Sequence, residues 1–260
     1  APVLVAGCSD QGQVASPEST AASMRVRTED YLPGLAADVH LPRSGAPRAT
    51  VVLVPGGGWS SADPAGLAPL AESLAASGYA AVTITYRTAA DGARFPRPVE
   101  DVACAVSWAA SHISGQGSGA LPVVILGHSA GAQLAALAAL DPTTFVGNCP
   151  STPVSPAGLV GLAGPYDIEA FGGPAEPLFG LPLERDPSAW AKGNSIRLAA
   201  NVPELPVLLI HGGADDLVPV AFTEAFTDAL RAGGHQVTLK VIDGVGHQGI
   251  YLAAVSASTI

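Results

Sequence analysis

The fold is decided by residues 122–140, which read PVVILGHSAGAQLAALAAL. The first five of these residues form a continuous apolar run, which is typical of a strand buried on both faces of a parallel sheet. The Ala- and Leu-rich run after the turn favours a helix that ends before Pro142. Between the two lies GHSAG at 127–131, which fits G-x-S-x-G in the strand-to-helix context that this motif requires. The stretch therefore predicts a tight turn that projects the Ser129 hydroxyl from the carboxyl end of a sheet.

Strand and helix patterns alternate on both sides of this stretch. Apolar runs or period-2 alternation predict further strands at residues 24–29, 35–41, 49–54, 80–86, 159–163, 206–210 and 236–242. Helical spacing and end signals predict helices at residues 64–77, 97–112, 221–232 and from 247 onward. We expect the first two strands to form a hairpin of edge strands. The alternation of the other elements predicts an α/β fold, with a mostly parallel sheet and crossover helices.

Residues 164–205 interrupt this alternation. They are rich in Pro, Gly and aromatic side chains and carry only a weak helical pattern near residues 189–200. A long irregular insertion in a compact domain usually has a function, so we expect it to form a roof over a pocket. Residues 24–260 are then one domain that includes this insertion, and residues 1–23 precede it as a tether.

Length and charge limit the classes of function. With 260 residues, of which 48% are hydrophobic, the chain can bury a substantial core as one domain. Its formal net charge of −10 disfavours nucleic acid as a partner, because an acidic surface repels phosphates. The longest apolar runs, such as residues 123–126, are far shorter than the roughly 20 residues of a membrane-spanning helix.

The N-terminus resembles a processing signal. Small residues precede Cys8, as they do at the end of bacterial lipoprotein signals, in which the cysteine becomes lipidated. On this interpretation, residues 1–23 are a signal remnant followed by a polar tether that contains Ser and Pro. The protein is then extracytoplasmic, lipid-anchored or secreted, and its membrane contact is a lipid on Cys8. The alternative is a short, disordered apolar tail.

The other two cysteines are Cys104 and Cys149. An extracytoplasmic compartment permits a disulfide between them, and two inert buried thiols are an equal alternative. The sequence has no C-x-x-C pair, and its six histidines do not cluster at metal-ligand spacing. We therefore expect no metal site.

A serine hydroxyl is a weak nucleophile and needs a neighbouring base. His247 is the candidate base, because its loop follows the last predicted strand and emerges at the same end of the sheet as Ser129. An imidazole base needs a carboxylate that fixes its tautomer. Asp215, just past a predicted strand, is favoured for this role, with Asp216 and Asp243 as alternatives. The resulting chain order of Ser, Asp and His is the one expected for this architecture.

Such a site also needs backbone N–H donors for the developing oxyanion. One candidate is Ala130, which follows the serine at the start of a helix. The other is the turn PGGGW at 55–59, where Gly57 and Gly58 let the backbone approach a substrate closely. Phosphate binding is a weak alternative, because no G-K-[ST] follows these glycines. The glycines at 115–119 precede a predicted strand, unlike those of a dinucleotide-binding turn.

Aromatic side chains are candidates for lining the substrate pocket. We expect Trp59, Tyr166 and Trp190 to line it. Phe171 and Phe179 are further candidates, and core packing is the alternative for each of the five. Walls rich in Gly and Pro favour a modest pocket, so we expect short acyl chains or acetylated carbohydrates in preference to long lipids.

Together these residues resemble the α/β-hydrolase superfamily and, within it, esterases of the hormone-sensitive-lipase and kynurenine-formamidase type. The resemblance covers about residues 49–251. PGGGW at 55–59 is similar to the family's HGGGW oxyanion motif, although the family usually has a histidine in place of Pro55. Further matches are YR at 86–87, FP at 95–96, ED at 100–101, GPYD at 164–167 and HGGADDLVP at 211–219.

The resemblance implies an α/β-hydrolase fold with an eight-stranded, mostly parallel sheet. It also implies Ser129 as nucleophile, Asp215 as acid and His247 as base. The function that follows is a serine carboxylesterase acting on a small-molecule ester through an acyl-enzyme, with no metal or organic cofactor. Two alternatives stay open: a peptidase or amidase of the same architecture, and a non-catalytic surface binding protein that retains the fold.

Overall fold

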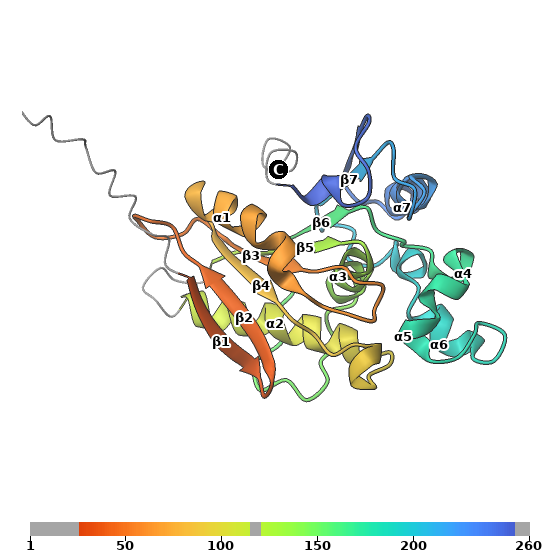
Figure 1. The fold of residues 1–260 in the computed structure, drawn as a ribbon, viewed down its shortest axis with the longest axis horizontal. Helices are drawn as coiled ribbons and strands as arrows, with labels where there is room; N and C mark the ends of the chain where they lie inside the picture. Colours follow the sequence, from red (N-terminus) through yellow and green to blue (C-terminus); the bar gives the residue numbers. More distant parts are fainter. Residues whose placement is uncertain (1–25, 115–120, 253–260) are drawn as a thin grey trace, which may run out of the picture.

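The structure is a computed structural model that describes residues 26–114 and 121–252. Its strands form a single sheet (Figure 1). These strands are β1 (Val26–Leu32), β2 (Leu35–His40), β3 (Thr50–Val54), β4 (Ala80–Ile84), β5 (Val123–His128), β6 (Gly158–Leu162), β7 (Val207–Gly212) and β8 (Val237–Ile242). The predicted eight-stranded, mostly parallel sheet is confirmed.

The strand order is β1-β2-β4-β3-β5-β6-β7-β8. From β4 to β8 every neighbouring pair is parallel, whereas β2 is antiparallel to both β1 and β4. The predicted hairpin therefore exists, but of its two strands only β1 lies at an edge of the sheet, because β2 is paired on both sides. A strand pattern predicts alternating burial, and it does not say how many neighbours a strand has.

Helices cover both faces of the sheet (Figure 1). The longer ones are α1 (Ala68–Ala76), α2 (Arg97–Ser114), α3 (Ala130–Leu140) and α7 (Ala221–Ala232). Successive side chains of a strand point to opposite faces. In β3, Val52 and Val54 join the core that contains residues of α2, α3 and α7, whereas Val51 and Leu53 join the core beside α1. Burial on both faces explains why β3 is apolar almost throughout.

The segment 164–205 is more helical than predicted. It contains α4 (Ile168–Phe171), α5 (Glu176–Phe179) and α6 (Pro187–Lys192), and the 3-10 turns η3 (Gly173–Ala175) and η4 (Ser195–Leu198). Asp167 and Asp186 cap α4 and α6, because each carboxylate accepts an N–H from three residues further on. Helices of one or two turns are too short for a hydrophobic period to reveal them.

The end of the chain also differs from its prediction. After residue 247, where a final helix was predicted, the described residues contain only the 3-10 turn η5 (Gly249–Tyr251). Cys8 and the predicted tether lie outside the described residues. Within residues 26–114 and 121–252, no helix combines the length and the apolar character needed to cross a bilayer.

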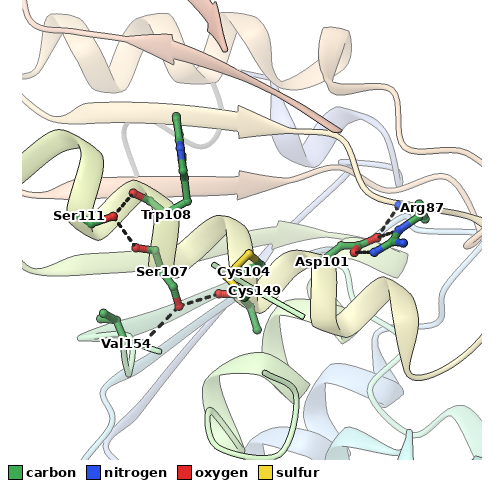
Figure 2. The surroundings of a disulfide bond; sticks show 9 residues. Arg87, Asp101, Cys104, Ser107, Trp108, Ser111, Cys149 and Val154 are labelled. Atoms are coloured by element: carbon green, nitrogen blue, oxygen red, sulfur yellow. Dashed lines mark hydrogen bonds and ion pairs between the residues drawn. A yellow bond between two sulfur atoms is a disulfide. The ribbon is translucent and has the colours of Figure 1, made fainter. Parts of the chain in front are cut away.

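A disulfide joins Cys104 of α2 to Cys149 in the connection between α3 and β6 (Figure 2). Cys104 is buried, with 2% of its surface exposed. The same connection is also held to α2 by the Val154 N–H, which donates to Ser107 Oγ at 3.3 Å. The sequence leaves open a disulfide or two buried thiols, and the structure contains the disulfide.

We expect the disulfide to stabilise the fold measurably. The bridge closes a loop across 45 residues, and in the chain-entropy account such a loop corresponds to about 4 kcal/mol of unfolding free energy. The Cys104→Ala/Cys149→Ala variant should lose about this amount in urea denaturation. A reductant should destabilise the wild type and leave the double variant unchanged. Equal stability of the oxidised wild type and the double variant would contradict a stabilising bridge.

Candidate active site

The carboxyl ends of β3, β5, β7 and β8 lie along one edge of the sheet, and the candidate residues follow these ends. Ser129 lies between β5 and α3 with φ 54° and ψ −124°, a conformation that L-residues rarely adopt. A Cβ on Gly127 would lie 2.3 Å from the Gly131 carbonyl oxygen, and one on Gly131 would lie 2.3 Å from that of Val54. Both motif glycines are therefore required by the close packing of this turn.

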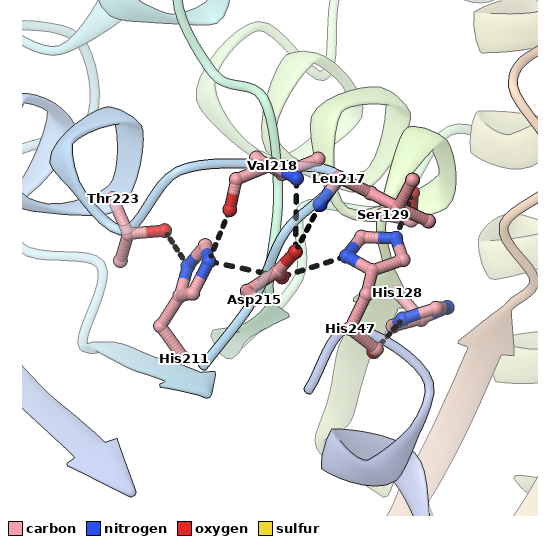
Figure 3. Close-up of polar contacts among 8 residues, drawn as sticks. All are labelled: His128, Ser129, His211, Asp215, Leu217, Val218, Thr223 and His247. Carbon is pink, nitrogen blue, oxygen red and sulfur yellow. Dashed lines mark hydrogen bonds and ion pairs between the residues drawn. The ribbon is translucent and has the colours of Figure 1, made fainter. Parts of the chain in front are cut away.

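Ser129, His247 and Asp215 form a chain of hydrogen bonds (Figure 3). The Ser129 Oγ lies 2.9 Å from His247 Nε2, and His247 Nδ1 lies 2.7 Å from Asp215 Oδ2. Asp216 and Asp243, the alternative acids, are exposed. The structure thus brings together the three residues that the sequence favoured. This arrangement lets the imidazole accept the serine proton while the carboxylate orients the ring.

The Asp215 carboxylate is held by backbone as well as side-chain donors. The N–H groups of Leu217 and Val218 donate to its Oδ1 at 3.0 and 2.9 Å. Burial by itself would raise the pKa of Asp215, but the donors from Val218, His247 and Leu217 outweigh burial and lower the pKa. Asp215 is therefore a fixed negative charge whose side chain is fully buried.

His211 lies on the other side of Asp215 (Figure 3). Its Nε2 is 3.1 Å from Asp215 Oδ2 and 2.8 Å from the Val218 carbonyl oxygen. Its Nδ1 is 2.7 Å from Thr223 Oγ1. Burial lowers the pKa of His211, so the ring is neutral, with Nε2–H as donor and Nδ1 as acceptor. His211 lies in β7 (Val207–Gly212) and Asp215 in the turn that follows, and no local sequence pattern predicts their contact.

His128 supports the loop that carries His247. Its Nε2 lies 3.1 Å from the His247 carbonyl oxygen, and the two rings lie 4.9 Å apart. Burial, together with the neighbouring His247 ring, lowers the pKa of His128 to about 3. His128 is consequently neutral above that pH and donates its Nε2–H to the carbonyl oxygen.

The glycine turn and Ala130 present backbone donors beside Ser129. Gly57 and Gly58 have φ of 135° and 57°, in the region that favours glycine. In the part of the chain that the structure describes, the N–H groups of Gly57, Gly58 and Ala130 donate no backbone hydrogen bond. Where the resembled family has a histidine, the carbonyl oxygen of Pro55 accepts the Tyr86 hydroxyl at 2.9 Å.

A cavity of about 480 Å³ opens over Ser129. Trp59 lines it, as does Phe171 from the insertion. The remaining lining residues are Pro55, Gly56, Gly57, Gly58, Asp63, Gly66, Leu67, His128, Ser129, Ala130, Pro165, Pro174, Leu217, Val218, His247, Gln248 and Tyr251. The insertion therefore contributes one wall of the cavity. Asp63 and Gln248 are polar residues that line the cavity and that the sequence does not predict.

The prediction that Tyr166 and Trp190 line the pocket is wrong. Both side chains are fully buried and do not line the cavity. The Tyr166 ring stacks on Phe226 with centroids 4.2 Å apart, and the Trp190 ring stacks on Phe179 at 4.5 Å. Packing inside the core is therefore what holds these aromatic residues, and a pattern of aromatic side chains cannot separate a pocket wall from a core.

Residues 26–114 and 121–252 contain no group of three or more His, Cys, Asp or Glu side chains that could hold a metal ion.

This sheet order, with a strained serine after β5 and an aspartate and a histidine following in chain order, defines the α/β-hydrolase class. The chain belongs to the BD-FAE family, whose family model matches residues 37–230. The resemblance to the α/β-hydrolase superfamily is thus confirmed.

Similar proteins have been named or solved in several organisms. Esterase LipC of Mycobacterium tuberculosis is 32% identical over 217 residues, which are 77% of this chain and 53% of LipC. The chain spans about half the length of the curated relatives that it matches. A truncated carbohydrate esterase from gut microbiota has a TM-score of 0.76 at 20% identity, over 86% of this chain and 87% of its own. The esterase Est2 of Thermogutta terrifontis has a TM-score of 0.73 at 21% identity, over 91% and 89%.

Proposed function

We propose that this protein is a serine carboxylesterase that hydrolyses short-chain or acetyl esters through an acyl-enzyme. The observation that carries the proposal is the pair of contacts from Ser129 Oγ to His247 Nε2, 2.9 Å, and from His247 Nδ1 to Asp215, 2.7 Å. The first distance suits proton transfer from the serine to the imidazole, and the second suits a hydrogen bond that orients the imidazole. Further support comes from relatives that are named esterases.

In the first half-reaction, the Ser129 Oγ attacks the ester carbonyl carbon while its proton passes to His247 Nε2. The carbonyl oxygen becomes an oxyanion and accepts the N–H of Ala130 and that of Gly57 or Gly58. The imidazolium, stabilised by Asp215, then gives its proton to the leaving alkoxide. The C–O bond to the alcohol breaks, and the acyl group remains on Ser129.

In the second half-reaction, water replaces the alcohol. His247 takes a proton from the water, and the water oxygen attacks the acyl carbon. The second oxyanion that forms accepts hydrogen bonds from the same N–H groups. Collapse of this intermediate expels Ser129, which recovers its proton from His247, and releases the carboxylic acid.

Support for a short acyl group comes from the shape of the cavity. Proline and glycine at 55–58, with Pro165 and Pro174, form walls that cannot withdraw as long flexible side chains can. The Thermogutta esterase, which shares the fold, has been solved with butyrate and with propionate bound. We therefore propose an acyl group of a few carbons.

The experiment for this proposal is a series of p-nitrophenyl esters of increasing acyl length. We expect kcat/KM to be highest at two to four carbons, roughly, and to fall by about 10-fold or more for chains that the cavity cannot accept. An optimum at about twelve carbons would overturn the short-chain assignment. A separate panel of acetylated sugars tests whether the alcohol part of the substrate is a carbohydrate.

We also propose that the protein works outside the cytoplasm, with a lipid on Cys8. The sequence before Cys8 supports the anchor, and a disulfide between Cys104 and Cys149 suits an oxidising compartment. Fractionation of the producing cell, with mass spectrometry of the N-terminal peptide, tests this location. A soluble cytoplasmic protein with an unmodified Cys8 would refute it.

A further inference from the structure

We propose that Gln133 is a positioning residue for the oxyanion hole, which it serves by accepting the indole N–H of Trp59 and so fixing the glycine turn against α3. Trp59 Nε1 donates to Gln133 Oε1 at 3.1 Å, across 74 residues of sequence. This role deepens the proposed ester hydrolysis and rests on it.

The turn needs such a restraint because of its backbone conformation. Gly57 and Gly58 have positive φ, and Trp59 continues the run with a φ of 56°. A tryptophan in the left-handed region is strained by about 1 kcal/mol or more, so surrounding contacts must hold it there. Its carbonyl oxygen accepts the Ala89 N–H at 2.8 Å, and its indole is 2% exposed. Pro55, which begins the turn, has neither an N–H nor a side-chain donor to add.

Gln133 connects this turn to the helix that carries the other oxyanion donor. It is fully buried and lies in the first turns of α3, where its N–H reaches the Ser129 carbonyl oxygen at 3.3 Å. The N–H of Ala130 belongs to the same part of α3. The Gln133 side chain therefore links the two sources of backbone donors directly, and these donors must converge on one oxygen atom to be effective.

The orientation of the Gln133 amide follows from its partners. Its Nε2 donates to the Gly193 carbonyl oxygen at 2.7 Å, and its Oε1 accepts from Trp59. Because an indole N–H can only donate and a carbonyl can only accept, the amide has one possible orientation. The Ser195 hydroxyl also donates to the main-chain carbonyl oxygen of Gln133 at 3.1 Å. The residues after α6 thus hold Gln133, and Gln133 holds Trp59.

The test compares Gln133→Met, which keeps the length of the side chain and removes the acceptor, with Trp59→Phe, which removes the donor. We expect Gln133→Met to lower kcat for p-nitrophenyl acetate by about 10- to 100-fold, because donors that are displaced lose most of the effect of an oxyanion hole. KM should change by less than about 2-fold, because the ground-state ester does not use these donors fully. The double variant should be no worse than Gln133→Met, because Gln133→Met already removes the acceptor of the Trp59 N–H and, in addition, the donor to the Gly193 carbonyl oxygen.

An independent readout follows the contact directly. In the wild type the indole N–H of Trp59 should exchange slowly with solvent in ¹⁵N NMR spectra, and in Gln133→Met it should exchange faster. Gln236→Met, at an exposed glutamine before β8, is the matched control and should change neither readout. Melting temperatures identify a variant that fails to fold, in which case Trp59→Phe supplies the kcat comparison.

Two results would overturn the role of Gln133. One is an unchanged kcat in a folded Gln133→Met or Trp59→Phe variant. The other is an additive loss in the double variant, which would mean that the two residues act separately. A wild type that hydrolyses no ester would instead refute the proposed function, and the positioning role would fall with it. An active wild type with an unaffected Gln133→Met variant refutes the positioning role and leaves the proposed function intact.

Discussion

Replacing Ser129 with alanine should lower kcat for p-nitrophenyl acetate by about 10⁴-fold or more. The hydroxyl is the atom that forms the acyl-enzyme, and the described site offers no second nucleophile in contact with His247. Oxyanion donors and binding contacts survive the change, so a residual acceleration of about 10³-fold over water is expected. Initial rates of p-nitrophenol release, with protein prepared apart from other esterases, measure this directly.

The matched control is Ser188→Ala, which removes an exposed hydroxyl from α6. It should leave kcat unchanged, because Ser188 does not line the cavity. Melting temperatures should be similar for the two variants and the wild type. If the kcat of Ser129→Ala were within about 10-fold of the wild-type kcat, the assignment of the nucleophile would be wrong.

Replacing Asp215 with asparagine should lower kcat by about 10³- to 10⁴-fold. The N–H groups of Leu217 and Val218 donate to Oδ1, so an asparagine would keep its oxygen there and turn its NH₂ toward His247. The NH₂ group can only donate, so His247 would present an unprotonated Nδ1 and carry its proton on Nε2. In that tautomer the ring cannot accept the Ser129 proton.

The exposed neighbour supplies the control for this substitution. Asp216→Asn removes a carboxylate one residue away that has no contact with His247, and it should leave kcat unchanged. If Asp216→Asn were the damaging change and Asp215→Asn the harmless one, the assignment of the acid would be wrong.

The lowered pKa of Asp215 also predicts how stability depends on pH. Because the folded-state pKa lies below the unfolded value of about 3.9, the ionised carboxylate stabilises the fold above that value. This contribution is lost as the pH falls through the folded-state pKa. Urea denaturation should therefore show a stability difference between wild type and Asp215→Asn that is constant near neutral pH and shrinks in acid. A difference that grows as the pH falls would contradict the sign of the shift.

Much of the fold could be predicted because the central strands are buried on both faces. β3 and β5 are short apolar runs bounded by turns, and such runs have few alternatives inside a chain that alternates strands and helices. The two-sided pairing of β2 could not be predicted, since strand order depends on long-range contacts. The short helices of the insertion, such as α4, lie below the length at which periodicity is informative.

The candidate site also has parts that the sequence predicts and parts that it does not. Ser129, Asp215 and His247 follow different parallel strands, so the topology alone places them at one edge of the sheet. The sequence places Tyr166 in the segment that forms a wall of the pocket, but its ring is buried against Phe226 instead. The contact between Gln133 and Trp59 joins α3 to the glycine turn after β3, and the sequence around either residue does not predict it.

The most direct test of the account is covalent labelling with a fluorophosphonate followed by mass spectrometry. A serine activated by a neighbouring imidazole reacts with this group, whereas ordinary surface serines do not. The account predicts one adduct per chain, located on Ser129, at a rate that falls sharply in Asp215→Asn and with no adduct in Ser129→Ala. An unlabelled wild type, or an adduct on another residue that persists in Ser129→Ala, would contradict it.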